Sequence, residues 1–184
     1  MIYTFISKVL IEFGGIYLDR DLYVVKSLDP FRKFEMSLDF GILGDLGSQV
    51  LIAHKNARFL RLYLQTYQKY DKTKWYWNAG HYPVKRIIDK YPYLIHRMNG
   101  EFGVSGLVMC PILYRENVNN WQKVYYAIHL LMKDNNIYHH KGWCFPGQNY
   151  PLVLIFDEEN VKTLNVTFAQ MVRLVLYNTT EIIS

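Results

Sequence analysis

The sequence feature that most restricts the fold is the segment Gly14-Gly-Ile-Tyr-Leu-Asp-Arg-Asp21, which directly follows a helical pattern. Apolar residues recur at helical spacing before it, which predicts a helix over residues 2–13 with one apolar face. Gly14 and Gly15 can adopt positive φ and end that helix. We expect residues 16–18 to form a short strand with apolar side chains on both faces, as in the centre of a sheet that is covered on both sides.

Two acids follow this strand, Asp19 and Asp21, separated by one residue. In an extended segment residues i and i+2 point to the same side, so both carboxylates are expected to face one point while Arg20 points away. Two such carboxylates repel each other, and a divalent cation relieves the repulsion. Oxygen ligands favour Mg²⁺ or Mn²⁺, which keep coordination positions open for substrate phosphates. The alternative interpretation is an ordinary pair of turn acids.

The segment from Gly14 to Asp21 resembles the metal-binding core of the glycosyltransferases with a DXD sugar-binding region. That group includes initiating α1,6-mannosyltransferases and α1,4-galactosyl- and N-acetylglucosaminyltransferases, and more of the chain is similar to the invertebrate members. Further segments that resemble the family follow in the expected order, namely Gly47–Ala53, Trp75–Gly80, Ile95–Arg97, Phe102–Val104, Tyr125–Leu131 and Phe168–Arg173. The resemblance therefore covers nearly the whole chain, and its GGIYLD-x-D motif is more specific than Asp-x-Asp alone.

The resemblance implies an α/β fold, a GT-A-like and Rossmann-related glycosyltransferase domain over residues 1–184. It implies transfer of a sugar from a UDP- or GDP-sugar to a hydroxyl of a glycan or glycolipid, with Mn²⁺ or Mg²⁺ as cofactor and with retention of anomeric configuration. Members of the family are single-pass type II membrane proteins of the Golgi lumen. The sequence offers neither a membrane anchor nor a strand for the nucleotide base before residues 2–13, so we expect the C-terminal portion of such a domain.

The resemblance also gives a set of candidate site residues. The expected metal ligands are Asp19, Asp21 and His129. The expected donor-binding residues are Gly15, Tyr17, Asp19, Asp21, Gln49, Asn78 and Gly80. No catalytic nucleophile is evident.

Several of these candidates have a purely structural alternative. His129 is expected at the edge of the apolar face of a helix, where a histidine can equally be a core or capping residue. Gln49 either contacts the sugar or ends a strand, and the segment from Asn78 to Gly80 is either a donor contact or a simple turn. His81 stands where related sequences often have an acidic residue, which weakens any claim for a catalytic carboxylate at that position.

Composition narrows the function classes further. Apolar residues make up 51% and aromatic residues 16% of the chain, which excludes a disordered protein. The net charge is +5, but the basic residues are scattered, so solvated helix faces are favoured over a nucleic-acid surface. The basic residues on or near expected helices are Arg58, Arg61, Lys69, Lys72, Lys74, Lys85, Arg86 and Lys90. No nucleic-acid motif is present, and no stretch is long enough to span a membrane.

The two cysteines and the two sequons do not narrow the choice of function. Cys110 and Cys144 can form neither a zinc site nor a disulfide framework, although they can pair in an oxidising lumen. The sequons at Asn165 and Asn178 permit N-glycosylation if the chain enters the secretory pathway. His139 and His140 are interpreted as plain surface residues rather than as a metal site.

The remaining pattern alternates helices with short apolar strands, which indicates an α/β fold. The expected elements are extended residues 22–25, a loop-rich stretch over 31–48, a strand over 50–53, a helix of about 14 residues capped by Asn56, a loop or strand over 75–79, and helices over 84–91, 121–132 and 168–175.

Two other functions compete with the glycosyltransferase hypothesis. An apolar strand followed by Asp-x-Asp also opens the haloacid-dehalogenase phosphatases, but Tyr23 stands where they have Thr or Val, and no later acidic pair is obvious. A catalytically inactive, truncated glycosyltransferase-like domain that binds a sugar or a partner is the more serious alternative. Hydrolysis of a donor in the presence of Mn²⁺ would separate the enzyme from the binding protein.

Overall fold

The computed structural model describes residues 2–74, 76–133, 136–137 and 156–183, which fall into two compact units. The sheet unit comprises residues 1–105 and 125–129, and the helical unit comprises residues 106–124 and 130–184. Helices and a small mixed sheet make up the fold, which confirms the α/β prediction. The expectation of a single domain over residues 1–184 stays a prediction.

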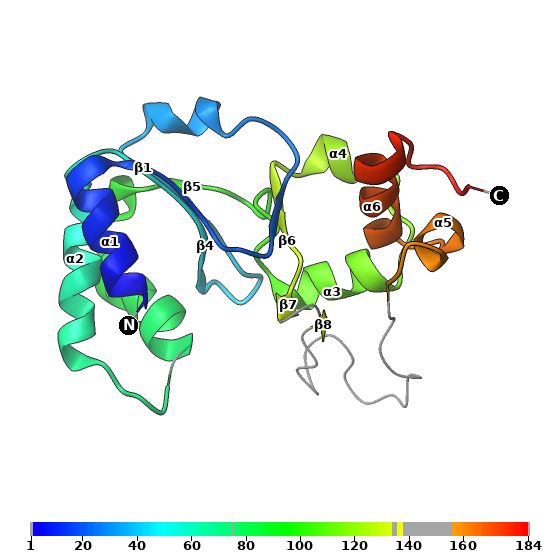
Figure 1. The fold of residues 1–184 in the computed structure, drawn as a ribbon. Coiled ribbons are helices and arrows are strands. Elements are labelled where there is room, and N and C mark those ends of the chain that lie inside the picture. The colour runs from blue at the N-terminus through cyan, green and yellow to red at the C-terminus, as the bar shows by residue number, and fades with distance from the viewer. Residues whose placement is uncertain (1, 75, 134–135, 138–155, 184) are drawn as a thin grey trace. The chain divides into compact units, whose positions relative to one another are not determined.

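The sheet unit is built on four strands in the order β1-β4-β3-β5 (Figure 1). Its strands are β1 (Gly15–Leu18), β2 (Leu22–Val24), β3 (Met36–Phe40), β4 (Leu46–Ala53), β5 (His96–Arg97) and β6 (Ala127–His129). β1 and β3 both run antiparallel to β4, and β5 runs parallel to β3. β2 and β6 form a separate antiparallel pair.

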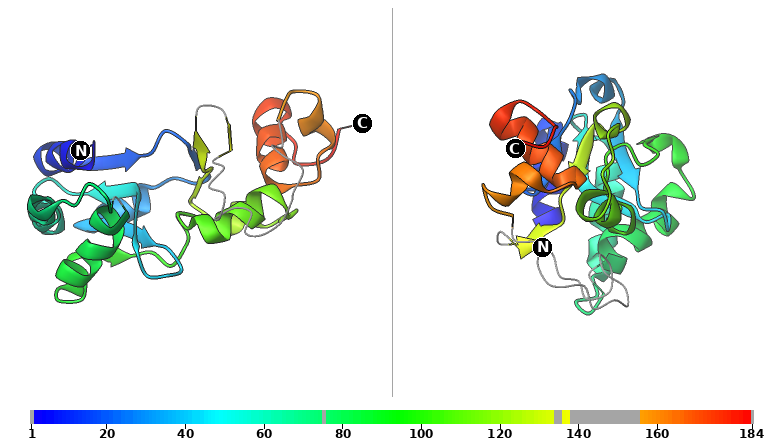
Figure 2. Two further views of the ribbon diagram at one scale, coloured as in Figure 1. Left: turned by 90° about the horizontal axis from the view of Figure 1, so that it is seen from below. Right: turned by 90° about the vertical axis from the view of Figure 1, so that its right-hand side faces the viewer.

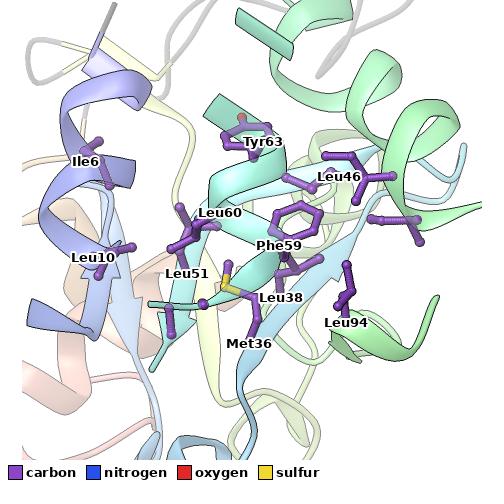
Figure 3. Packing of buried hydrophobic residues seen from close by; sticks show 14 of the residues in the cluster. Ile6, Leu10, Met36, Leu38, Leu46, Leu51, Phe59, Leu60, Tyr63 and Leu94 are labelled. Carbon is purple, nitrogen blue, oxygen red and sulfur yellow. The ribbon is translucent and has the colours of Figure 1, made fainter. Parts of the chain in front are cut away.

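Helices cover one face of this sheet. They are α1 (Ile2–Phe13), α2 (Arg58–Thr66), the 3₁₀ turns η2 (Tyr67–Lys69) and η5 (Pro92–Leu94), and the π-helical turns η3 (Trp77–His81) and η4 (Val84–Ile88). The 3₁₀ turn η1 (Asp29–Lys33) lies on the opposite face. Figure 3 shows the resulting core, in which Ile6 and Leu10 of α1 meet Leu60 of α2 above the sheet. The even-numbered residues of β3, Met36, Leu38 and Phe40, belong to the same core, because side chains on a strand alternate between its two faces.

The opposite face of the sheet has a smaller core of its own. Val50 and Ile52 of β4 point into it and meet Phe31 of η1. The rings of Phe102 and Tyr126 stand edge-on to Phe31, with centroids 5.1 and 4.7 Å away. β3 and β4 are therefore covered on both faces.

The helical unit contains α3 (Gly106–Tyr114), α4 (Trp121–Val124), the strand pair β7 (Met132–Lys133) and β8 (Asn136–Ile137), α5 (Asn160–Thr163) and α6 (Thr167–Tyr177). α5 and α6 pack side by side (Figure 2). Arg173 of α6 is 1% exposed and donates hydrogen bonds to the carbonyls of Val161, Leu164 and Thr180. These bonds satisfy the buried guanidinium without a carboxylate.

The local predictions around the two glycines are confirmed, but the prediction of a central strand is wrong. α1 ends at Phe13, and Gly14 and Gly15 have φ of +69° and +115°. β1 has β4 on one side and no other strand of the described chain on the other. It is therefore an edge strand, with Ile16 and Leu18 38% and 36% exposed. Sequence pattern alone cannot separate an apolar edge strand from a central one, because both carry the same residue types.

The predictions for residues 31–48 and 121–132 are also wrong. In the first segment polar residues are buried, and in the second a distant strand pairs with the chain. The stretch over 31–48 is not loop-rich, because it contains β3, a fully buried strand in which Ser37 and Asp39 alternate with apolar residues. The expected helix over 121–132 stops at Val124, and residues 127–129 pair with β2 as the strand β6. His129 therefore lies on a strand and not on a helix, and its partner in the register is Leu22.

Smaller differences concern caps and turns. The cap of α2 is Ala57, while Asn56 has φ of +64° and accepts a hydrogen bond from Arg61. The turn η3 is helical where a loop or strand was expected. The predictions for residues 2–13, 22–25, 50–53, 84–91 and 168–175 are confirmed apart from their ends.

Within the described residues, no helix has both the length and the apolar content needed to cross a bilayer. Cys144, His139 and His140 lie outside the described residues.

Candidate metal centre

The two glycines direct the chain from α1 into β1. The amide of Gly14 donates to the carbonyl of Leu10 at 2.8 Å, which closes the last turn of the helix. A Cβ on Gly14 would lie 2.7 Å from the backbone nitrogen of Lys55, so no larger residue fits there, and the positive φ disfavours one independently. Glycine at this position lets the chain reverse tightly and start β1 against β4.

Strand pairing fixes the acidic turn at both of its ends. The amide of Asp19 donates to the carbonyl of Gln49 on β4 at 2.9 Å, which extends the β1–β4 ladder by one residue. After the turn, Leu22 of β2 is paired with His129 of β6. Residues 19–21 form a turn rather than the extended segment that the sequence suggested. Their carboxylates converge because the two ladders hold the ends of this turn.

Asp19, Asp21 and His129 form a cluster, here called the acid–histidine cluster, in which one ligand atom from each residue lies within 4.8 Å of the others. Nε2 of His129 is 3.3 Å from Oδ2 of Asp21, and these side chains are 13% and 15% exposed. All three predicted metal ligands therefore meet at one place, although the reasoning from a helix for His129 was wrong.

Burial dominates the electrostatics of the cluster. It raises the pKa of the Asp19 carboxyl above its ordinary value. The hydroxyl of Tyr17, which donates a hydrogen bond to Oδ1 of Asp19, opposes this shift in pKa, as does the nearby imidazole of His129. The charge of Asp21 raises the pKa of Asp19 further. In the absence of a cation, ionised Asp19 is therefore held in an unfavourable environment.

The donor atoms of the cluster suit a divalent cation. Carboxylate oxygens are the preferred ligands of Mg²⁺, Ca²⁺ and Mn²⁺, and imidazole adds a nitrogen ligand that Mg²⁺ and Ca²⁺ seldom use. The mixed oxygen and nitrogen set favours Mn²⁺ among these ions. Nδ1 of His129 is buried and has no hydrogen-bond partner within the described part of the chain. This is a departure from the usual metal-bound histidine, whose second nitrogen is held by a hydrogen bond.

Two other predicted residues, Tyr17 and Gln49, lie next to Asp19. Tyr17 of β1 contacts Asp19 directly, whereas Gly15 lies at the opposite end of β1. Gln49 lies opposite Asp19 on β4, and its Oε1 is buried without a hydrogen-bond partner among the described residues. An unsatisfied buried acceptor is costly, and a ligand hydroxyl can satisfy it once the side chain turns toward Asp19.

Asn78 and Gly80 have structural roles in their own loop. Nδ2 of Asn78 donates to the carbonyls of Asp71 and Lys74 at 2.6 and 2.8 Å, and its Oδ1 accepts from the amide of Asp71 at 3.1 Å. A Cβ on Gly80 would lie 3.1 Å from the carbonyl oxygen of Leu46, so glycine lets η3 approach β4 closely. The structure thus accounts for both residues through packing and local hydrogen bonds.

The sequence analysis did not predict the pairing of His81 with Asp45. Nδ1 of His81 lies 2.8 Å from Oδ1 of Asp45, whose side chain is only 9% exposed. The two residues are 36 positions apart and no motif links them. A carboxylate therefore does lie beside position 81, but it comes from the turn between β3 and β4.

Comparisons of this chain with models of protein families, with curated proteins and with solved structures give no match.

Proposed function

We propose that the chain is a metal-dependent glycosyltransferase that transfers a sugar from a UDP- or GDP-sugar to a hydroxyl of a glycan or glycolipid. The proposal extends to a GT-A-like fold, to retention of configuration and to residence in the Golgi lumen, as the resemblance of the sequence implies. The single observation that carries it is the convergence of Asp19, Asp21 and His129 at the end of the strand that begins with the two glycines.

Each residue of the cluster has a distinct role in this proposal. Asp21 and His129, whose ligand atoms face each other, hold Mn²⁺ or Mg²⁺ directly. Asp19, oriented by the hydroxyl of Tyr17, either completes the metal site or accepts a hydrogen bond from the donor or from a metal-bound water. When bound, the cation supplies positive charge beside the diphosphate leaving group, where negative charge grows as the glycosidic bond breaks. Oε1 of Gln49 accepts a hydrogen bond from a donor hydroxyl.

A sugar-binding protein without turnover is the second candidate. It is favoured by the position of β1, which is an edge strand among the described residues, with none of them forming a strand on its open side. The resemblance leads us to expect a further strand that holds the nucleotide base. A metal cluster that does not also position the donor for transfer still binds a metal and a diphosphate.

The test measures binding and turnover on the same samples. The 184-residue chain is titrated with UDP- and GDP-sugars by calorimetry with Mn²⁺ and with EDTA, and the release of nucleoside diphosphate is followed over time. An enzyme shows Mn²⁺-dependent binding and release, and Asp21→Asn loses both. Asp89→Asn, which removes an equal charge from an exposed position, is the matched control. Binding without release supports the second candidate, and the absence of metal-dependent binding contradicts both.

A further inference from the structure

A concave site on the sheet unit lies far along the chain from the acid–histidine cluster. It is a cavity of about 280 Å³ lined by residues of the segments 62–69 and 82–91, which include the second half of α2 and all of η2 and η4. Its lining includes the basic residues Lys69, Arg86 and Lys90 and the aromatic residues Tyr82 and Tyr91. We call this cavity the basic pocket.

The basic pocket carries uncompensated positive charge. No acidic residue is part of its lining, and no ion pair joins Lys69, Arg86 or Lys90 to a carboxylate in the described segments of the chain. These residues were among the scattered basic positions whose simplest interpretation was solvated helix faces. The structure instead brings three of them to one cavity, where like charges repel and an anion would relieve the repulsion.

Arg86 is held in place for such a role. Its Nε donates to the hydroxyl of Tyr82 at 3.0 Å, and its guanidinium lies over the Tyr82 ring, 5.3 Å from the centroid. The other guanidinium N–H groups have no hydrogen-bond partner within the residues that the structure describes. A fixed guanidinium with free donors is the group that binds phosphate or sulfate oxygens in a bidentate manner.

The rest of the lining suits a sugar ring better than a bare ion. Tyr91, which is 41% exposed, offers a ring face and a hydroxyl. The Tyr82 ring already contacts the guanidinium of Arg86 and stacks on Trp77. Gln65, Thr66 and Gln68 add amide and hydroxyl groups that can pair with the hydroxyls of a sugar. The volume of about 280 Å³ lies just below the range for small-molecule pockets, roughly 300–1,000 Å³, so one ring with its ester fits better than an oligosaccharide.

We propose that the basic pocket binds a phosphate or sulfate ester carried on a single sugar ring, with Arg86, Lys69 and Lys90 on the ester and Tyr91 and the amides on the ring. This site shares no residue with the acid–histidine cluster and needs no metal. It therefore stands independently of the proposed glycosyltransferase activity.

The test is a calorimetric titration in EDTA, which removes divalent cations from the cluster. The probes are N-acetylglucosamine 6-sulfate, glucose 6-phosphate, neutral glucose and inorganic phosphate. We expect both esters to bind, neutral glucose not to bind, and inorganic phosphate to bind at least about tenfold more weakly than the sugar esters. The affinity for the esters should fall as salt is added, because the contacts are ionic.

Two double variants with the same net charge distinguish binding in the pocket from a general effect of positive charge on the affinity for the esters. Arg86→Gln with Lys90→Gln should weaken ester binding by at least about tenfold. Lys33→Gln with Lys55→Gln removes two exposed basic residues from outside the pocket and should change the affinity by less than about twofold. Far-ultraviolet circular dichroism checks that both variants fold. If the pocket variant does not fold, Lys69→Gln alone is measured against Lys55→Gln with the same expectations.

Several results would overturn the proposal. They are no binding of either ester, equal binding of glucose and glucose 6-phosphate, equal binding of inorganic phosphate and the sugar esters, or equal losses in the pocket and control variants. A lipid surface is tested separately with vesicles that contain a phosphorylated inositol lipid. Binding to these vesicles without binding of the soluble sugar esters would assign the pocket to a membrane headgroup and would also overturn the proposal.

Discussion

Asp39 and Asp19 are aspartates of the same sheet unit, the first fully buried and the second half-buried, and they differ in the groups that hydrogen-bond or face their carboxylates. Asp39 is fully buried in β3, and its carboxylate accepts the amides of Phe40, Gly100 and Phe102 at 2.7, 2.8 and 2.8 Å. Asp19 accepts the hydroxyl of Tyr17 and otherwise faces Asp21 and His129. Backbone amides of the protein satisfy the carboxylate of Asp39 with hydrogen bonds, whereas the carboxylate of Asp19 lies beside a second acid.

Burial raises the pKa of both carboxyls, but the opposing contributions differ in kind. At Asp39 three backbone N–H groups lower the pKa, and they are permanent parts of the fold. At Asp19 a hydroxyl and an imidazole lower the pKa, while Asp21 raises it. The comparison suggests that Asp39 stabilises the fold and that Asp19 belongs to a site that is completed by a ligand.

The largest effect is expected at Asp39. Asp39→Ala leaves three backbone amides without their acceptor, two of them from the segment that follows β5. An unsatisfied buried donor costs about 1–3 kcal/mol, so the free energy of unfolding should fall by about 3 kcal/mol or more. Urea denaturation measures this loss. A loss below about 1 kcal/mol would mean that Asp39 is no more structural than Asp19, and the comparison would fail.

The next effect is expected at Asp21. Asp21→Asn keeps the size of the side chain but removes its charge, so binding of Mn²⁺ with a nucleoside diphosphate should weaken by at least about tenfold, or about 1.4 kcal/mol. The free energy of unfolding in EDTA should change little, because the mutation also removes repulsion from Asp19. Calorimetry and a thermal melt measure the two quantities. Unchanged metal-dependent binding would mean that Asp19 and Asp21 are ordinary turn residues.

The pH dependence of Asp19→Asn sharpens the comparison. Because the pKa of Asp19 is raised above 3.8 in the folded state, the folded chain binds more protons than the unfolded chain between 3.8 and the raised pKa. The contribution of Asp19 to the stability of the wild type in EDTA should therefore fall as pH rises through this interval, and the variant should lack this component. Urea denaturation from pH 3.5 to 7 should show the variant gaining stability relative to the wild type as pH increases. A constant difference would contradict the assigned burial of the charge.

The smallest effect is expected at Gln49. Gln49→Leu removes an unsatisfied buried acceptor, so the free energy of unfolding in the absence of ligand should rise by about 0.5–1 kcal/mol. The affinity for a nucleotide sugar should fall, while the affinity for the nucleoside diphosphate alone should not change. Parallel titrations with both ligands measure this difference. Equal changes for the two ligands would remove Gln49 from the sugar contacts.

The part of the site that contains Asp19 and Asp21 could be predicted from the sequence, because it depends only on neighbouring residues. The helix, the two glycines, the strand and the two acids lie within 20 consecutive residues, and each follows from spacing or backbone preference. The same reasoning placed β1 at the centre of the sheet, because the apolar residues Ile16 and Leu18 do not reveal which strands lie beside them. Position within a sheet depends on the order of strands, which is a property of the whole chain.

The position of His129 in the site could not be predicted in this way, because it depends on pairing between strands that are far apart in the sequence. His129 enters the cluster through the pairing of β6 with β2, across more than 100 residues of sequence. β3 was missed because the polar residues Ser37 and Asp39 lie at buried positions, and the partners that satisfy Asp39 follow about 60 residues later. The Asp45–His81 pair and the basic pocket depend on the same kind of packing between distant segments.

The central claim is that Asp21 and His129 hold one divalent cation beside Asp19, and pulsed electron paramagnetic resonance of Mn²⁺ tests it most directly. The sample contains the full chain, Mn²⁺ and inorganic pyrophosphate, which has no nitrogen and represents the diphosphate of a donor. The wild type and the control His54→Gln should both show coupling of Mn²⁺ to an imidazole ¹⁴N, and His129→Gln should not. The absence of ¹⁴N coupling in the wild type, or equal coupling in His129→Gln, would contradict the claim.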